Sequence, residues 1–434
     1  MKILTVDIGT GTQDIFLYDS NLNIENGFKL VLPSPTMMVH RRVRQAIEAR
    51  NPILLTGHQM GGGPSAWAIE GAARAGLTVY MTPSAATTLN DELDKVEALG
   101  ITIISEDEVS GLLPHVSRFE LKDFDFELLS KTFEDYGVSL NDLEAIAVAV
   151  FDHGNAPPGV SDRQFRFDYL DERIRARNSL SAFAYLSEDI PGIMTRLQSV
   201  ADSAGELPCP LVVMDTAPAA VLGAGFDPIV ATREQKIICN VGNFHTLAFR
   251  LGEQGIEGVF EHHTGEIDLS KLESLIRALA DSTLKHEDVF EDMGHGALMY
   301  SPVPLKFGND AFDVVVTGPR RSMFDRQSKT LAPGAHPLSP PAPGSRSTEL
   351  QALGSRDKSG VPRTWSATMP GSAGVVSPKS LRPYFATPFG DMMIAGCFGL
   401  LAGTAEVLPN LAETIQGSLR GERGRGLAPW DLPS

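Results

Sequence analysis

The sequence has few cysteines, few aromatic residues and a shortage of positive charge. Its 434 residues include 3 Cys and 7% aromatic residues, and 37 Lys and Arg stand against 54 Asp and Glu, which gives a net charge of −17. An acidic surface repels phosphate backbones, so we expect no nucleic-acid partner. A small anionic ligand is still compatible with this charge, because backbone N–H groups bind anions whatever the net charge of the protein.

The cysteines and the apolar segments exclude further classes of protein. Cys209, Cys239 and Cys397 lie far apart and form no CxxC pair, so a disulfide scaffold or a cysteine-bound zinc or iron–sulfur cluster is poorly supported. No window approaches 18 uncharged apolar residues, which predicts no membrane span. The first residues, MKILTVDIGTGTQD, lack the long apolar stretch and the cleavage site of a signal peptide. We therefore expect a cytoplasmic protein without a membrane partner.

Short apolar strands alternate with helical segments along most of the chain, which predicts an α/β fold. Helices are expected over 65–75, 84–99, most of 120–145, 180–200, 269–280, 286–299 and 390–403. Strands are expected over 3–8, 15–18, 53–56, 77–81, 101–104, 145–151, 211–214, 236–240, 246–251 and 313–317. Several of these strands are continuous apolar runs, which is typical of strands buried on both faces.

One segment differs from the rest in composition. From Arg326 to Ser380, 24 of 55 residues are Pro, Gly or Ser, and 7 basic residues stand against 2 acidic ones. The segment has no apolar periodicity, so we expect a disordered or loosely ordered insert rather than part of the core.

Two glycine hairpins carry the strongest functional signal. In the first, Asp7 ends a strand and Gly9-Thr10-Gly11-Thr12 forms the turn. A tight glycine turn exposes several backbone N–H groups that bind phosphate oxygens, the threonines add hydroxyl donors, and Asp7 is placed to hold a hydrated Mg²⁺. The alternative is an ordinary hairpin that uses these residues as turn formers.

The second hairpin, around Gly242 and Asn243, lies more than 200 residues later and follows the same logic. Two such hairpins suggest two similar half-domains that face each other across a nucleotide. Here too an ordinary hairpin with Asn-Gly turn residues is the alternative.

Five motifs together resemble the actin, sugar-kinase and Hsp70 ATPase superfamily. They are VDIGTGTQDIFLYD and IICNVGNFHTLAFRL for the two phosphate motifs, DVVVTGPRR for the adenosine turn, and DTAPAAVLGAG and GDMMIAGCFGLLAG for the two connecting helices. LLTGHQMGGG is similar to a sugar-kinase strand and turn. Within this superfamily, TGHQMGGGP, the Asp152-His153-Gly154 loop and YFATPFGDMMIAGCFGLL look most like a family labelled pyruvate formate-lyase activating protein. A radical activase of that name needs three closely spaced cysteines, which this chain lacks.

The resemblance implies two RNase-H-like lobes with a cleft that binds ATP and Mg²⁺. Residues 1–210 would form the first lobe, 211–324 and 381–419 the second, 325–380 an insert and 420–434 a tail. Phosphates would be held by a set of turn residues, Gly9, Thr10, Gly11, Thr12, Gly242 and Asn243. Asp7 would hold the metal, Gly318 and Arg320 would lie at the adenosine, and Asp152 would act as the base.

The chain departs from the superfamily pattern at the second hairpin. Asn240 replaces an Asp and Phe244 replaces a Gly, while Gly318-Pro319 stands where Gly-Gly is usual. Asn is a weaker partner for Mg²⁺ than Asp. Two functions therefore remain open: an enzyme that transfers or hydrolyses the γ-phosphate on an unidentified small-molecule or protein substrate, and a sensor that binds a nucleotide or another small ligand without turnover.

Other polar residues also have structural alternatives. Asp152 is the expected base, but an Asp after a strand also forms Asx turns. His153, His58 and His245 are candidate bases or phosphate donors, with loop packing as the alternative. The run from Glu261 to Glu266, with His262 and His263, lacks the helical spacing of a zinc protease and is expected to be an exposed turn.

Overall fold

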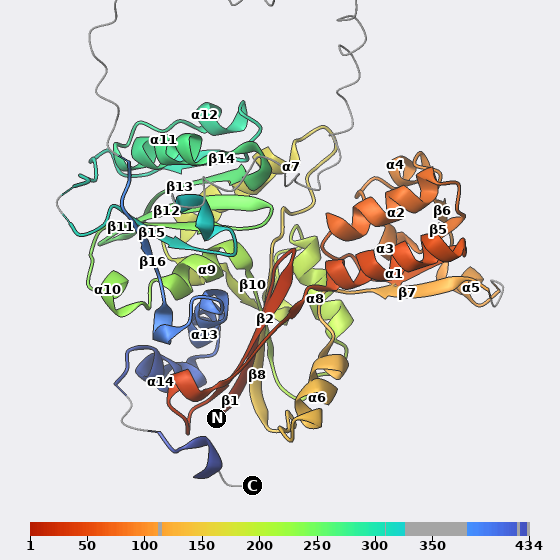
Figure 1. Ribbon diagram of the computed structural model, residues 1–434, viewed down its shortest axis with the longest axis horizontal. Helices are drawn as coiled ribbons and strands as arrows, with labels where there is room; N and C mark the ends of the chain where they lie inside the picture. Colours follow the sequence, from red (N-terminus) through yellow and green to blue (C-terminus); the bar gives the residue numbers. More distant parts are fainter. Residues whose placement is uncertain (112–114, 309, 326–379, 423–425, 432–434) are drawn as a thin grey trace, which may run out of the picture. The chain divides into compact units, whose positions relative to one another are not determined.

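A computed structural model describes residues 1–111, 115–308, 310–325, 380–422 and 426–431. The insert expected over 325–380 lies outside the described residues except for Asp325 and Ser380. The described part contains three sheets, and both glycine hairpins are confirmed (Figure 1). It is an α/β fold, as the alternation of strands and helices predicts.

The first sheet has six strands in the order β3-β2-β1-β8-β10-β9. They are β1 (Lys2–Ile8), β2 (Thr12–Asp19), β3 (Phe28–Pro33), β8 (Leu143–Val150), β9 (Ala184–Leu186) and β10 (Leu211–Asp215). The first three form an antiparallel meander, after which β8 runs parallel to β1 and β10 runs parallel to β8. β8 is buried along nearly its whole length, which explains its continuous apolar sequence.

The second sheet repeats this arrangement. Its strands, in the order β14-β13-β12-β11-β15-β16, are β11 (Lys236–Val241), β12 (His245–Gly252), β13 (Gly255–His263), β14 (Gly296–Met299), β15 (Val314–Thr317) and β16 (Pro383–Phe385). An antiparallel meander of β11, β12 and β13 is again followed by two parallel strands, β15 and β16. Five strands of each sheet therefore share one order and one set of directions.

A small parallel sheet is inserted between β3 and β8 of the first sheet. Its order is β6-β5-β4-β7, from β4 (Ile53–Gly57), β5 (Val79–Met81), β6 (Thr102–Ile103) and β7 (Ser117–Leu121). It has an apolar core of its own and packs against α1 (Pro35–Ala49), α2 (Pro64–Arg74), α3 (Pro83–Ala86) and α4 (Leu93–Glu97), while α5 (Glu106–Val109) lies at its outer end (Figure 1). This unit lies within residues 1–210, the range expected to form the first lobe as a whole.

The remaining helices connect and cover the two large sheets. They are α6 (Phe126–Asp135), α7 (Asp162–Ala176), α8 (Thr195–Ala204), α9 (Thr216–Ala224), α10 (Pro228–Ala231), α11 (Leu269–Ala280), α12 (His286–Phe290), α13 (Ala395–Val407) and α14 (Pro409–Leu419). α9 packs directly against α13. None of the described helices has the length and apolar character that a bilayer span requires.

Two segments are associated with the first sheet, although the sequence assigned them to the second lobe. β10, over 211–215, is a strand of the first sheet, although 211 was expected to open the second lobe. α13 packs on α9 and, among the strands, on those of the first sheet, although 381–419 was expected to belong to the second lobe. Within that range, β16 does lie in the second sheet. Both corrections have the same cause: chain order gives the sequence of the elements but not which sheet an apolar element covers.

Four expected helices are wrong in extent, the first of them over 120–145, where only α6 lies between β7 and β8. The helix over 84–99 is broken between α3 and α4, where the Asn90 side chain accepts the Glu92 N–H in a turn. The segment 180–200 contains β9, which pairs with β10 before α8 begins. The segment 286–299 is the short α12 followed by β14, because Gly294 and Gly296 disfavour continuation of the helix.

Candidate functional site

A cavity of about 1220 Å³ opens between the two hairpins. Its lining comes from the ends of strands of both large sheets and from the glycine-rich loop after β4. Most of the expected site residues line it: Asp7, Gly9, Thr10, Thr12, Asp152, Gly242, Asn243 and Gly318. Gly11 and Arg320 are not among the lining residues, but each lies beside one that is.

The two hairpin turns have the same backbone geometry. The Gly9 N–H donates to the Thr12 carbonyl at 2.9 Å, and the Gly242 N–H donates to the His245 carbonyl at 2.9 Å. The tips approach each other closely, because a Cβ on Gly11 would lie 2.7 Å from Nδ2 of Asn243. A side chain at residue 11 would therefore displace the Asn243 side chain.

Asp7 and Asp14 form a carboxylate pair at the base of the first hairpin. They are directly opposite in the β1–β2 register and both line the cavity. Burial raises the pKa of Asp7 to about 6, against a hydrogen bond of 2.6 Å from the Thr216 hydroxyl. Burial and the charge of Asp7 raise the pKa of Asp14 to about 8. Oδ1 of Asp14 is buried and has no hydrogen-bond partner among the described residues. The pair is therefore short of positive charge.

α13 begins beside this pair. A Cβ on Gly396, in the first turn of α13, would collide with the Asp7 carboxylate. Asp14 lies in the first hairpin motif, but its pairing with Asp7 was not predicted. The hairpin register could have indicated this pairing, since two residues equidistant from a turn face each other across it.

Asp152 holds the start of α8. It is 3% exposed. Its Oδ1 accepts the Gly154 N–H at 2.8 Å, and its Oδ2 accepts the N–H groups of Arg196 and Leu197 at 3.0 and 2.9 Å. Burial raises the pKa of this carboxyl, against the backbone hydrogen bonds. The bond to Gly154 is the Asx turn that the sequence left open, and three backbone donors occupy both oxygens.

The expected adenosine turn lies under the second hairpin. Gly318, which follows β15, lies against Asn240 and Val241 with φ of +98°. The Arg320 N–H donates to the Val241 carbonyl at 2.9 Å, and its side chain is exposed. Arg321 donates to the Gly318 carbonyl at 3.0 Å and lines the cavity. Arg321 is therefore the arginine of this pair that faces the cavity.

Phe244, which stands in place of a glycine, covers the loop after β4. Its ring lies 5.4 Å from that of Trp67 and would be 3.2 Å from a Cβ on Gly63. The same loop is fixed by Asp123, which accepts the Gly61 N–H and pairs with Arg196 at 2.7 Å. Phe244 thus joins the second hairpin to the small parallel sheet.

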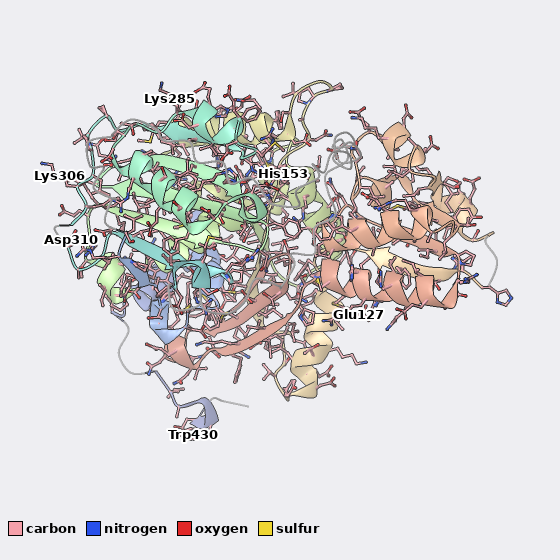
Figure 2. All side chains as sticks on the ribbon, turned by 45° about the horizontal axis from the view of Figure 1, so that its top comes forward. Glu127, His153, Lys285, Lys306, Asp310 and Trp430 are labelled. Carbon is pink, nitrogen blue, oxygen red and sulfur yellow. The ribbon has the colours of Figure 1, made fainter. Side chains whose placement is uncertain are left out.

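The histidine candidates separate into two groups. His153, on the loop after β8, and His245, at the start of β12, line the cavity; His153 is labelled in Figure 2. His58 is not among the lining residues. The run from Glu261 to Glu266 is not an exposed turn at its start, because Glu261 and His262 belong to β13 and are 2% and 0% exposed. Glu261 pairs with Arg166, and His262 lies 3.3 Å from Asp292.

The fold and the site together define an α/β protein in which two similarly ordered sheets present glycine hairpins to one cavity. The chain belongs to the family described as "Putative pyruvate format-lyase activating enzyme (DUF1786)", whose sequence model matches residues 60–323. No curated protein matched the chain.

Two solved structures are similar over part of the chain. The ROK hexokinase from Thermus thermophilus is 13% identical with a TM-score of 0.22, over 59% of this chain and 48% of its own length. An exopolyphosphatase-like protein is 8% identical with a TM-score of 0.22, over 68% of this chain and 61% of its own. The chain thus spans about half the length of the hexokinase and about three fifths of the length of the exopolyphosphatase-like protein. Both TM-scores are low, so the fold is described from the strand order of this chain alone.

Proposed function

We propose that the chain binds a magnesium nucleotide between its two hairpins, on a two-lobed, actin-like ATPase fold. The observation that carries this proposal is the pair of hairpin turns, which share one backbone hydrogen bond and meet at their tips over the cavity. Turns of this kind offer converging N–H groups to phosphate oxygens. The shared strand order of the two sheets supports the two-lobed fold.

The residues present fit the proposed ligands. Thr10, Thr12, Gly242 and Asn243 would hold phosphate oxygens, with Gly318 and Arg321 toward the adenosine. Asp7 and Asp14 would hold Mg²⁺ directly or through its water ligands, since a divalent cation compensates two carboxylates that otherwise resist ionisation. When bound, Mg²⁺ supplies charge neutralisation to the phosphates.

The hydrogen bonds of Asp152 bear on whether the bound nucleotide is turned over. Its oxygens are occupied by Gly154, Arg196 and Leu197, so we assign it to positioning the loop and α8 rather than to proton transfer. This observation favours a second candidate function, a sensor that binds the nucleotide without transferring its γ-phosphate. The fit of Phe244 against Trp67 also gives that departure from the superfamily pattern a structural role.

Radical chemistry is not part of the proposal. The family description names an activating enzyme, and a radical activase of that type needs three cysteines close together. Cys239 lies within β11, Cys397 lies within α13, and Cys209 precedes β10. The three thiols are therefore spread over separate elements.

Isothermal titration with ATP, ADP and AMP, each with and without Mg²⁺, tests the proposal. We expect saturable, Mg²⁺-dependent binding of ATP or ADP that Asp7→Asn weakens. Thr132→Val is the control, because Thr132 is a half-buried residue of α6 whose hydroxyl donates to the Leu128 carbonyl of its own helix. Equal binding by wild type and Asp7→Asn would refute the assigned site. Phosphate release measured on the same samples separates the enzyme from the sensor.

A further inference from the structure

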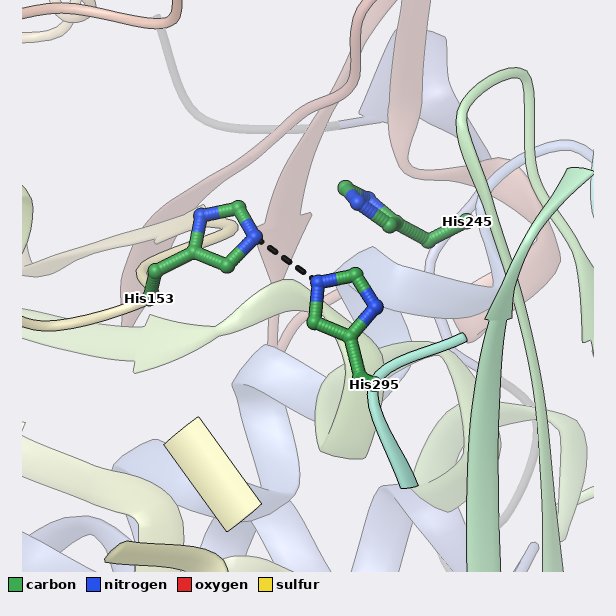
Figure 3. Close-up of side chains that lie close together, drawn as sticks. All are labelled: His153, His245 and His295. Atoms are coloured by element: carbon green, nitrogen blue, oxygen red, sulfur yellow. Dashed lines mark hydrogen bonds between the residues drawn. The ribbon is translucent and has the colours of Figure 1, made fainter. Parts of the chain in front are cut away.

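Three histidines from distant parts of the chain meet beside the cavity. His153 follows β8, His245 begins β12, and His295 directly precedes β14 (Figure 3). One ring nitrogen of each lies within 4.8 Å of the others, and Nε2 of His153 is 3.0 Å from Nε2 of His295. His153 and His245 line the cavity, while His295 is fully buried behind them.

The cluster is built from both large sheets at once. His153 follows a strand of the first sheet, whereas His245 begins one strand of the second sheet and His295 directly precedes another. The ring of Phe151 stacks on His245, with 4.1 Å between centroids and 9° between planes. The orientation of His245 is therefore fixed by packing.

A carboxylate lies on the far side of His295. Oε1 of Glu261 is 3.4 Å from Nδ1 of His295, and neither atom has a hydrogen-bond partner among the described residues. Glu261 is itself held by Arg166 at 2.9 Å, and Arg166 by Asp215 at 2.6 Å. A carboxylate facing one nitrogen of a histidine leaves the other nitrogen as the metal-binding one, which is the usual outer arrangement of protein metal sites.

The fixed charges near the cluster are paired. Arg166 forms ion pairs with Asp215 and Glu261. Arg196 forms an ion pair with Asp123. Neither guanidinium is therefore an uncompensated positive charge beside the three imidazoles.

We propose that His153, His245 and His295 bind a divalent transition metal, with Zn²⁺ as the reference ion, and leave a coordination position open toward the cavity. Imidazole ligands favour zinc and its first-row neighbours over magnesium. Zinc–nitrogen bonds of about 2.0–2.1 Å in a tetrahedral site place the nitrogens about 3.4 Å apart. The observed separations, from 3.0 to at most 4.8 Å, bracket this value. Three protein ligands with one open position is the pattern of catalytic rather than structural zinc sites.

This site is chemically distinct from the proposed magnesium site. The magnesium site uses the carboxylates of Asp7 and Asp14 in the first hairpin, whereas the zinc site uses three imidazoles. At the open position, the zinc would bind a water molecule or an oxygen atom of a ligand in the cavity. The two proposals can fail separately, since zinc binding is measured without nucleotide.

Calorimetric titration of chelator-treated full-length protein with Zn²⁺, at pH 7 and without nucleotide, tests the site. We expect one equivalent to bind, and His153→Ala and His245→Ala each to weaken binding by at least about 100-fold, more than an outer-shell change costs. His40→Ala is the matched control, because this imidazole lies on α1 beside the small parallel sheet, with its Nδ1 2.8 Å from the Pro64 carbonyl oxygen. Asp7→Asn should bind Zn²⁺ like the wild type.

Co²⁺ supplies a second readout that does not depend on affinity alone. Its visible absorption reports the ligand set, so wild-type protein should show bands that His153→Gln shifts or abolishes while its far-UV circular dichroism stays unchanged. His153→Gln also covers the case in which an alanine variant does not fold. Zn²⁺ binding that is absent from the wild type, or is equal in wild type, His153→Gln and His245→Ala, would overturn the proposal and leave the trio as a packed hydrogen-bonding group.

Discussion

The pH dependence of stability tests the carboxylate pair at the first hairpin. Asp14 carries a pKa of about 8 in the folded protein and about 3.9 in an unfolded chain. The folded state therefore keeps a proton that the unfolded state has lost. Stability from this group is complete below pH 4 and declines as pH rises through 8, by at most about 1.4 kcal/mol per pH unit.

The change is Asp14→Asn, which removes this titration but keeps the shape of the side chain. Between pH 5 and pH 7.5, the linkage gives an upper limit of about 3 kcal/mol, and partial solvation of a half-buried carboxyl reduces it to about 1–3 kcal/mol. Asp14→Asn should therefore gain stability relative to wild type as pH rises. Asp94→Asn, an exposed carboxylate on α4, is the control.

Urea unfolding of the three proteins at pH 5, 6, 7 and 7.5 measures the difference. A difference between wild type and Asp14→Asn that stays constant over this range would refute the argument, because linkage requires it to grow. Mg²⁺ bound at the pair should reduce the slope for wild type, since a cation then replaces the proton.

Three further changes follow from the same contacts. Asp152→Ala should lower the free energy of unfolding by about 1–3 kcal/mol, because it leaves buried N–H groups unpaired; a neutral result in urea unfolding would contradict the capping role. Arg166→Met should lower the free energy of unfolding by about 3–5 kcal/mol, since Asp215 and Glu261 lose their buried cation. A variant whose thermal unfolding matches that of the wild type would contradict this prediction. Gly11→Val should weaken binding of Mg²⁺-ATP about tenfold or more, about 1.4 kcal/mol, by displacing Asn243; unchanged affinity in calorimetry would show that the tips need not meet.

The hairpins and the central strands were predictable because their signals are local. Glycine turns flanked by apolar strands predict a hairpin directly, and the apolar run of β8 predicts a buried parallel strand. α7 was missed because its sequence is highly charged. Its Arg166 is nevertheless buried, where it pairs with Asp215 and Glu261 from elements that lie far away in the sequence.

The site itself was predictable only where it is made of turns. His295 follows a short helix and precedes a strand, and nothing near it in the sequence indicates that it meets His153, 142 residues earlier. The occupied oxygens of Asp152 likewise depend on α8, which lies more than 40 residues further along the chain. Contacts of this kind arise from the pairing of sheets, which no local pattern specifies.

Amide hydrogen exchange on the two hairpin turns tests the central claim most directly. The peptides that contain residues 9–12 and 242–245 are compared without ligand and with ADP plus Mg²⁺ well above the dissociation constant. If one nucleotide is held between the hairpins, both turns gain protection together, and Asp7→Asn abolishes the gain in both. Saturating nucleotide that protects neither turn, or only one, would contradict a phosphate site formed by the two.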